Sequence, residues 1–374
     1  MRTFGRYLAR EVSSKTLLVL LGFLGLFLVF DLVAEMKEIG RNDYGLGDAF
    51  WYSLLRVPAA AYGVLPIACL IGGLWAFSLF SSTSEFSVMR ASGMTPSQAV
   101  RWAIFMGSPF VVFCVLLSEL IVPFSEVRSQ SVRSPVFSAQ GPSALYSGYW
   151  LRDPSDFHVD VVKERIINLG GSSNRRGLRD VRVYEFDGQQ RLIRVLDARS
   201  LAYEGSMDAL GIAHNWRLGD VDFIGFGADG SVVNGRLPSL SLPLSLSPTT
   251  VESLMAKPEQ MSATDTWIYA TYLRSTGQAS ARYEISFWKK LIYPFLNIVM
   301  LLLALPAAYL LVRQGGVSAR VFLGILIGVA FHLLNSLFSH LGVLNTWPAP
   351  VVAAIPTGLA LLLAMAMLLR VQRT

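Results

Sequence analysis

The sequence contains little charge and almost no cysteine. Only 16% of the residues are Asp, Glu, Lys or Arg, and 53% are apolar. Soluble globular domains average about 25% charged residues. The apolar residues form long uncharged runs at both ends of the chain. This pattern excludes a soluble enzyme with one core, and it also excludes a disordered chain. Cys69 and Cys114 both lie within these runs. A disulfide scaffold, or a thiolate metal site in the central region, is therefore excluded.

Motifs for nucleotides, metals and acyl transfer are also missing. The sequence has neither G-x-x-x-x-G-K-[ST] nor G-x-S-x-G, so the chain does not itself hold ATP in a P-loop. Its histidines lack the spacing that places two zinc ligands on one helix face. Gly225–Gly230 matches G-x-G-x-x-G but is followed by the strand-like Ser231-Val-Val. A dinucleotide site needs a helix there, so we predict a glycine-rich hairpin.

The apolar runs predict membrane-spanning helices, each of which needs about 20 apolar residues. The run Val321–Leu369 is too long for one helix, and Asn345–Pro350 divides it in two. The first run has a basic start, but it is long and lacks a small-residue cleavage site, which favours an uncleaved helix over a signal peptide. We therefore expect six helices, three on each side of a central region. The runs are Thr16–Ala34, Pro58–Ser84, Trp102–Val122, Leu291–Val312 and Val321–Leu369.

Lysine and arginine in the short connecting segments predict the orientation. Cytoplasmic segments carry the excess of these residues, whereas long loops cross regardless of charge. The side richer in lysine and arginine contains both termini, so both termini are predicted to be cytoplasmic and the central region extracytoplasmic. That side holds Arg2, Arg6, Arg10, Lys15, Arg90, Arg101, Arg313, Arg320, Arg370 and Arg373, and the opposite side holds Lys37, Arg41 and Arg56. The net charge of +6 suits anionic headgroups and needs no nucleic acid.

The central region predicts a β-domain. Its segments mix aromatic and β-branched residues with polar ones, and Asp-Gly and Gly-Gly turns separate them. They suggest a sandwich or an open barrel-like sheet, followed by a helix at Ser262–Ser275. The expected strands are Ser147–Leu151, Phe157–Val162, Val181–Phe186, Arg191–Leu196 and Ser200–Tyr203, with Glu204-Gly205 and Asp229-Gly230 among the turns. The domains are then an N-terminal membrane half at 1–123, a β-domain at 124–288 and a C-terminal membrane half at 289–374.

Several residues stand out within this layout. Asp31 and Glu119 lie at the outer ends of spans one and three, where they could simply reach the interface or line a path for polar headgroups. Gly324 and Gly328 form G-x-x-x-G, which permits close packing within the chain or with another chain. The cytoplasmic loop at about 84–94 predicts a short helix in which Phe86, Met89 and Arg90 share a face. It could contact a cytoplasmic partner or lie on lipid.

From this loop outward, the sequence resembles the lipopolysaccharide-transport permeases of Gram-negative inner membranes, the LptF/LptG family. The resemblance covers essentially the whole chain, and the runs Ser275–Gln278 and Arg282–Lys290 look more like LptG than LptF. The matching residues are Arg6-Tyr7, Glu85 with Met89-Arg90-Ala91-Ser92-Gly93-Met94-Thr95, Glu119 with Pro123 and Glu126, Ser275-Thr-Gly-Gln278, and Arg282-Tyr-Glu-Ile-Ser-Phe-Trp-Lys-Lys290 with Pro294.

The resemblance implies a non-catalytic subunit of an ABC transporter. It would pair with an LptF-like permease, an LptB-like ATPase dimer that uses ATP and Mg, an LptC-like bitopic protein and an LptA-like periplasmic bridge, with no cofactor in this chain. The β-domain would be a jellyroll that receives lipopolysaccharide, and spans one and five would form lateral gates. Coupling to the ATPase would involve Glu85, Phe86, Met89, Arg90, Ser92 and Gly93.

The resemblance also implies contacts with lipid phosphates. Lys37 and Arg133 occupy the basic positions after spans one and three. Where some relatives carry a lysine late in span one, this chain has Asp31; Asp31 stays a candidate residue of the headgroup path, but it departs from the family at the position where a phosphate would pair. Two other classes remain open from the residues alone. One is a membrane-anchored scaffold or receptor that binds a protein through its β-domain, and the other is a periplasmic enzyme, although no catalytic constellation is visible.

Overall fold

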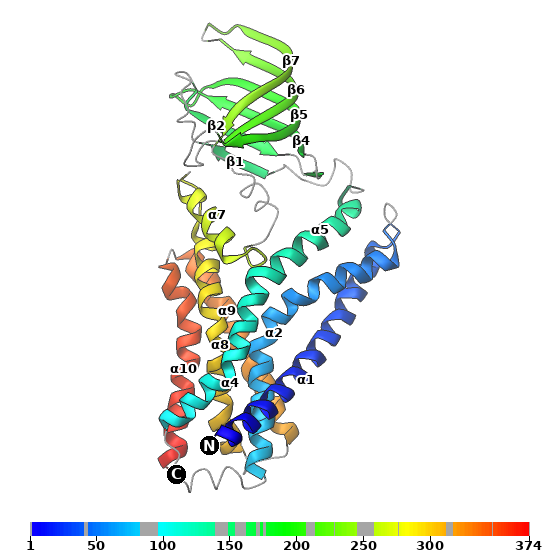
Figure 1. Ribbon diagram of the computed structural model, residues 1–374. Helices are drawn as coiled ribbons and strands as arrows, with labels where there is room; N and C mark the ends of the chain where they lie inside the picture. The colour runs from blue at the N-terminus through cyan, green and yellow to red at the C-terminus, as the bar shows by residue number, and fades with distance from the viewer. Residues whose placement is uncertain are drawn as a thin grey trace. The chain divides into compact units, whose positions relative to one another are not determined.

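The computed structural model contains a helical unit and a β-unit (Figure 1). The helical unit comprises Met1–Ser134, Pro258–Trp267 and Ala281–Thr374, and the β-unit comprises Pro135–Lys257 and Ile268–Ser280. The prediction of a helical membrane protein with an inserted β-domain is confirmed. The structure describes residues 2–40, 44–82, 96–138, 149–153, 162–169, 173–174, 177–206, 214–227, 229–244, 258–275, 277–311, 317–345 and 347–373.

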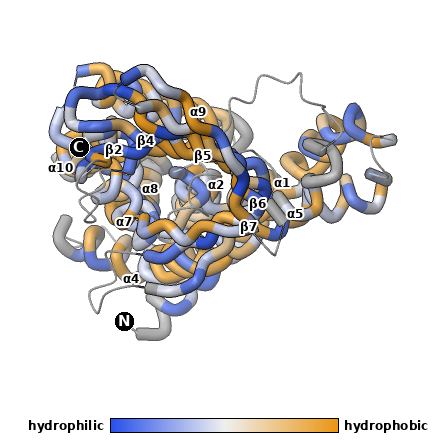
Figure 2. Tube along the Cα trace, turned by 90° about the horizontal axis from the view of Figure 1, so that it is seen from above, coloured by the Kyte–Doolittle hydropathy of each residue, from blue (hydrophilic) through white to orange (hydrophobic). Residues whose placement is uncertain are grey.

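The described residues include six helices long and apolar enough to cross a membrane. The start of α1 and the end of α10 lie at the same end of this unit (Figure 1), as an even number of spans requires. Figure 2 shows long apolar stretches along these helices and a mixture of polar and apolar residues along the strands. Five of the spans lie in α1 (Arg2–Glu35), α2 (Leu46–Ser82), α8 (Ala281–Leu311), α9 (Val317–Leu344) and α10 (Ala349–Arg373), and the sixth, Val100–Ser129, runs from α4 (Pro96–Leu116) into α5 (Val122–Ser138). A 3-10 turn, Met36–Glu38, follows α1, and a π-helix, Leu117–Ile121, joins α4 to α5.

Helix α8 lies at the centre of the helical unit, where it packs against α2, α4 and α10. Its Met300 and Leu301 are fully buried, as are Leu70 and Leu74 of α2. In the most apolar 18-residue stretch of each helix, 72% of the stretch is buried in α2 and in α8, but only 11% is buried in α1 and in α9. Helices α1 and α9 therefore expose most of their apolar surface, which must face lipid or another subunit.

Small residues allow the peripheral helices to approach α2 closely. A Cβ on Gly72 would lie 2.5 Å from the Thr16 Cα atom, so α1 crosses α2 with backbone almost in contact. On α9, a Cβ on Gly324 would lie 2.7 Å from Leu74, and one on Gly328 would lie 2.8 Å from Ile67. The G-x-x-x-G pattern thus packs α9 against α2 of the same chain.

The β-unit is one antiparallel sheet in the order β1-β2-β4-β5-β6-β7, with a short β3 paired to β4. Helix α7 (Ala263–Ser275), predicted from the sequence, is confirmed. The β6–β7 turn at Gly227–Gly230 confirms the glycine-rich hairpin. The strands are β1 (Tyr149–Asp153), β2 (Glu164–Leu169), β3 (Ser173–Asn174), β4 (Gly177–Phe186), β5 (Leu192–Ser206), β6 (His214–Phe226) and β7 (Val232–Leu244).

Some predicted strand boundaries are wrong. Arg191–Leu196 and Ser200–Tyr203 belong to the single strand β5. The predicted turn at Glu204-Gly205 is a β-bulge instead, because the register with β6 shifts between Tyr203 and Gly205 and Gly205 has φ +147°. Gly tolerates this conformation without a Cβ clash, so it bends the strand without ending it. Most of Phe157–Val162 lies outside the described residues.

The strand register arranges in rows the face of the sheet that carries the buried residues of β2 and β4. One row, here called the charged row, has an acidic or basic residue on each of β1, β2, β4 and β5 and uncharged residues on β6 and β7. The two following rows, here called the apolar rows, are almost entirely hydrophobic. The charged row is Asp153, Arg165, Glu185, Arg194, Gly225 and Val233; the apolar rows are Leu151, Ile167, Val183, Leu196, Phe223 and Gly235, then Tyr149, Leu169, Val181, Ala198, Val221 and Leu237.

Candidate functional site

The predicted coupling segment connects α2 to α4. Helix α2 ends at Ser82 and α4 begins at Pro96. The segment's own residues lie outside the described part of the chain, so their role remains a prediction. They are Glu85, Phe86, Met89, Arg90, Ser92 and Gly93.

Asp31 forms an ion pair across the α1–α2 contact. Its Oδ1 atom accepts a hydrogen bond from Arg56 of α2. The Asp31 side chain is 9% exposed and that of Arg56 is 35% exposed. The guanidinium also lies over the rings of Phe27 and Tyr52, an arrangement that favours a cation. Sequence reasoning missed this pair because it assigned Arg56 to a loop, whereas α2 already begins at Leu46.

The two predicted headgroup residues follow spans one and three. Lys37 is exposed in the 3-10 turn directly after α1. The buried Glu35 beside it accepts a hydrogen bond of 3.2 Å from the Tyr44 hydroxyl, which fixes the connection to α2. Arg133 lies in α5, but its side chain is outside the described residues. The structure therefore places the Lys37 side chain and only the backbone of Arg133.

Glu119 and Lys290 hold the start of α7, a role that sequence reasoning missed. Glu119 lies in the π-helix, and both its carboxylate oxygens accept from the Ala263 N–H, at 3.1 and 3.2 Å. Lys290 is 6% exposed and donates to the carbonyl oxygens of Glu259, at 3.1 Å, and Met261, at 2.5 Å. A carboxylate at a helix N-terminus and an ammonium on the preceding carbonyls are both favourable. Together they fix the chain where it returns to the helical unit.

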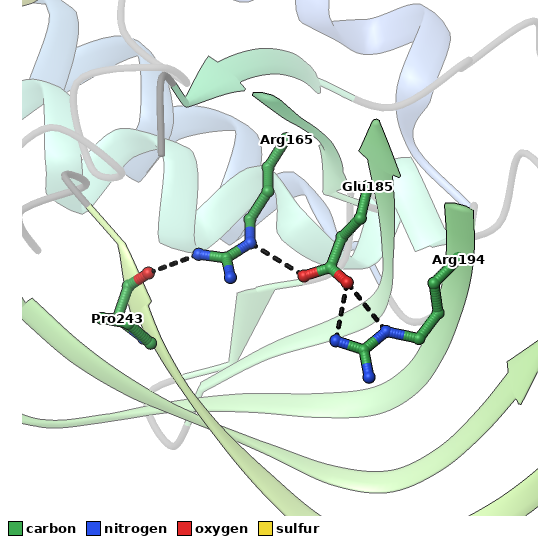
Figure 3. Close-up of polar contacts among 4 residues, drawn as sticks. All are labelled: Arg165, Glu185, Arg194 and Pro243. Atoms are coloured by element: carbon green, nitrogen blue, oxygen red, sulfur yellow. Dashed lines mark hydrogen bonds and ion pairs between the residues drawn. The ribbon is translucent and has the colours of Figure 1, made fainter. Parts of the chain in front are cut away.

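Arg165 and Glu185 form a buried ion pair within the charged row (Figure 3). Arg165 donates from Nε to Glu185 at 2.9 Å and from Nη1 to the Pro243 carbonyl at 2.9 Å. Glu185 also accepts from the Nε atom of Arg194 at 2.7 Å. Pro243 is on β7, and in the sheet order β4, β5 and β6 lie between β2 and β7. The sheet must therefore curve until β7 approaches β2, in agreement with the predicted barrel-like sheet.

Tyr272 ties α7 to the first strand of the β-unit. Its hydroxyl donates to the carbonyl oxygen of Arg152 at 3.0 Å. Burial raises the pKa of the Tyr272 phenol, and the nearby Asp153 and Tyr269 raise it further. The hydroxyl is therefore protonated, as a donor must be, at any physiological pH.

Two of the histidines lie on the peripheral helix α9. His332 and His340 have exposed side chains on α9. No cluster of His, Cys, Asp or Glu suited to a metal ion occurs in the part of the chain that the structure describes. The described residues provide apolar surface on α1 and α9, an ion pair between the first two spans and a sheet with charged and apolar rows on one face.

Comparisons with known proteins agree with this arrangement. The family described as "Lipopolysaccharide export system permease LptF/LptG" matches residues 6–370. A Haemophilus influenzae protein, lipopolysaccharide export system permease protein LptG, is 26% identical over 357 residues, which cover 96% of this chain and 95% of that protein. The Escherichia coli K12 protein of the same name is 25% identical over 374 residues, covering 99% of both chains.

Proposed function

Since the chain belongs to the LptF/LptG family of lipopolysaccharide export permeases, we propose that it is a transmembrane subunit of an ABC transporter that extracts lipopolysaccharide from the inner membrane. The subunit itself is a non-catalytic, multi-pass transport protein. Its partners would pass the lipid to a periplasmic bridge that leads to the outer membrane. The observation that carries this proposal is the family match over residues 6–370, which includes all six candidate spans and the β-unit.

The physical requirements of lipid extraction support the proposal. Removing acyl chains from a bilayer costs about 0.8 kcal/mol per exposed CH₂ unless another apolar surface receives them. The helical unit offers such surface on α1 and α9, which we infer to be the lateral gates, with Gly324 and Gly328 packing α9 on α2. The apolar rows of the β-unit would provide the next surface along the path.

The energy must come from partners. The sequence has no P-loop, so an LptB-like ATPase dimer would bind ATP and Mg, and this chain would need no cofactor. An LptF-like permease would complete the membrane cavity, while an LptC-like bitopic protein and an LptA-like bridge would continue the periplasmic path. Orientation follows the basic residues of the short segments, with both termini cytoplasmic and the β-domain in the periplasm.

Three groups of residues have separate roles in this proposal. Those of the 84–94 loop couple the chain to the ATPase. Lys37 and Arg133 contact the lipid phosphates at the outer ends of spans one and three. Asp31 pairs with Arg56, which neutralises the acidic side chain so that it does not repel the phosphates.

Charge reversal in the loop tests the proposal. The double variant Glu85→Lys with Arg90→Glu should lose the ATPase during co-purification in mild detergent, because each changed side chain would repel its former partner. ATP-dependent release of lipopolysaccharide should fall with it. Arg101→Glu, on the same predicted side at the start of span three, is the control and should retain the ATPase.

Unchanged assembly and unchanged lipid release in the double variant would refute the assigned coupling site. A wild-type chain that co-purifies with no ATPase would argue against the transporter itself.

A further inference from the structure

The charged row is unusual for the inside of a sheet. Arg165 and Glu185 are 1% and 0% exposed by side chain, and Asp153 is fully buried opposite Arg165. Burying charges costs several kcal/mol per ion, and well-packed apolar residues often give equal stability. The neighbouring apolar rows show that hydrophobic residues can fill this face of the sheet. The charges therefore call for an explanation beyond folding.

Arg194 differs from the other members of the row because it is partly open to solvent. Its side chain is 37% exposed, while the Glu185 carboxylate that it contacts is 0% exposed. Arg194 contacts Glu185 through Nε, at 2.7 Å, and Nη2, at 2.6 Å, and both atoms meet the same carboxylate oxygen. A guanidinium has five N–H donors in a planar fork. The Nη1 edge of Arg194 can therefore donate to an anion while the pair with Glu185 remains (Figure 3).

Among the described residues, little covers the strand position next to Arg194. The neighbour of Arg194 in the row is Gly225, which has no side chain. Among the described residues, a Cβ on Gly225 would have only the Val233 carbonyl oxygen within 4 Å, at 3.8 Å. Val233, the last member of the row, is 59% exposed. In the next row, Phe223 is half-buried and presents apolar surface beside the gap.

We propose that Arg194 and the gap over Gly225 bind the phosphate of the transported lipid while its acyl chains lie against Phe223 and Val233. This inference rests on the proposed function and adds a headgroup site within the β-domain. Charge complementarity selects the occupant, because guanidinium binds phosphate in two-point geometry and the flanking surface is apolar. Arg165 and Glu185 are positioning residues, since Arg165 fixes the carboxylate that orients Arg194.

Crosslinking in the assembled transporter tests the site. The probe is p-benzoyl-phenylalanine in place of Val233, and the cargoes are lipopolysaccharide and the same lipid with its lipid A phosphates removed. Arg194→Gln should lower the ATP-dependent crosslinking of the phosphorylated lipid by roughly three- to tenfold, the loss expected for a partly exposed, charge-assisted hydrogen bond. It should leave the dephosphorylated lipid unchanged, because that cargo has no phosphate for the guanidinium.

Two further variants separate binding from folding. Arg182→Gln breaks an equivalent pair, Arg182 with Asp197, on the solvent face of the same two strands, and should change neither cargo. Gly225→Val places a side chain in the gap while Arg194 itself is retained, and should lower crosslinking of both cargoes. Arg194→Lys retains the charge and should recover part of the signal for the phosphorylated lipid.

The outcomes distinguish the two proposals. Equal losses for both cargoes in Arg194→Gln, or no loss for either, would overturn the headgroup site. So would full crosslinking in Gly225→Val. If the wild-type chain crosslinks lipid at a probe replacing the exposed Leu21 of α1 but never at position 233, this inference fails alone. If neither probe captures lipid, the proposed function fails with it.

Discussion

At the residue scale, the charges that the structure places in unexpected surroundings are the most informative. Asp31, Glu119, Arg165, Glu185 and Lys290 each have specific partners from a different element. From the sequence alone, these charged residues would be assigned to the surface or to the membrane interface. A single sequence does not show which distant residue will pair with a charge. The sequence singled out Asp31 and Glu119 but could not show Arg56 or the start of α7 as their partners.

The Asp31–Arg56 pair gives a prediction at this scale. Asp31→Arg and Arg56→Asp should each lower the amount of folded chain in the membrane, because each leaves like charges facing one another near the apolar core. Joining the two changes should restore the pair in reverse and recover most of the loss. The measurement is the fraction of full-length chain that remains monodisperse after detergent extraction and mild heating.

The matched control for this exchange is Lys15 with Glu11, an ion pair within α1 itself. Its reversal should have little effect, because pairs four residues apart on a helix contribute only about 0.3–0.5 kcal/mol. A double exchange at Asp31 and Arg56 no better than the worse single variant would show that the two residues do not interact.

At the scale of elements, the sequence predicted the spans better than the strands. Long apolar runs have few alternatives in a membrane protein, so all six helices lie where the runs predicted them. None of the five predicted segments covers β2, β3, β6 or β7, although the predicted hairpin at Gly225–Gly230 implies a strand on each side of it. The buried Arg165 breaks the expected pattern of β2, and β7 contains Pro238 and Pro243 at the sheet's last position, where an absent N–H is tolerated.

The crossing of α1 and α2 gives a prediction for elements. Gly72→Ala should separate the two helices, because the new Cβ would lie 2.5 Å from the Thr16 backbone, which cannot move aside like a flexible side chain. We expect a loss of about 1–3 kcal/mol, as for other overpacked sites. Thermal unfolding of the detergent-solubilised chain, followed by loss of monodispersity, measures it.

Gly63→Ala is the control on the same helix. A Cβ at Gly63 would have nothing within 4 Å among the described residues, and alanine favours a helix over glycine by about 1 kcal/mol. This variant should be neutral or slightly stabilising. Equal behaviour of the two glycines would mean that the close approach of α1 to α2 does not exist in the membrane.

At the scale of the whole molecule, composition indicated a membrane protein with an inserted β-domain, and the structure has both parts. The curvature of the sheet, the π-helix that presents Glu119 and the amphipathic rows needed three-dimensional structure, because they depend on strand register and on contacts between distant elements.

The most direct test of the central claim is ATP-dependent transfer of lipopolysaccharide from proteoliposomes to a soluble periplasmic bridge protein. The liposomes would contain this chain with its LptF-like, LptB-like and LptC-like partners. We predict transfer that requires both ATP and this chain and that stops when the chain is omitted. Transfer that continues at the same rate without the chain would contradict the claim that it is a permease for this lipid.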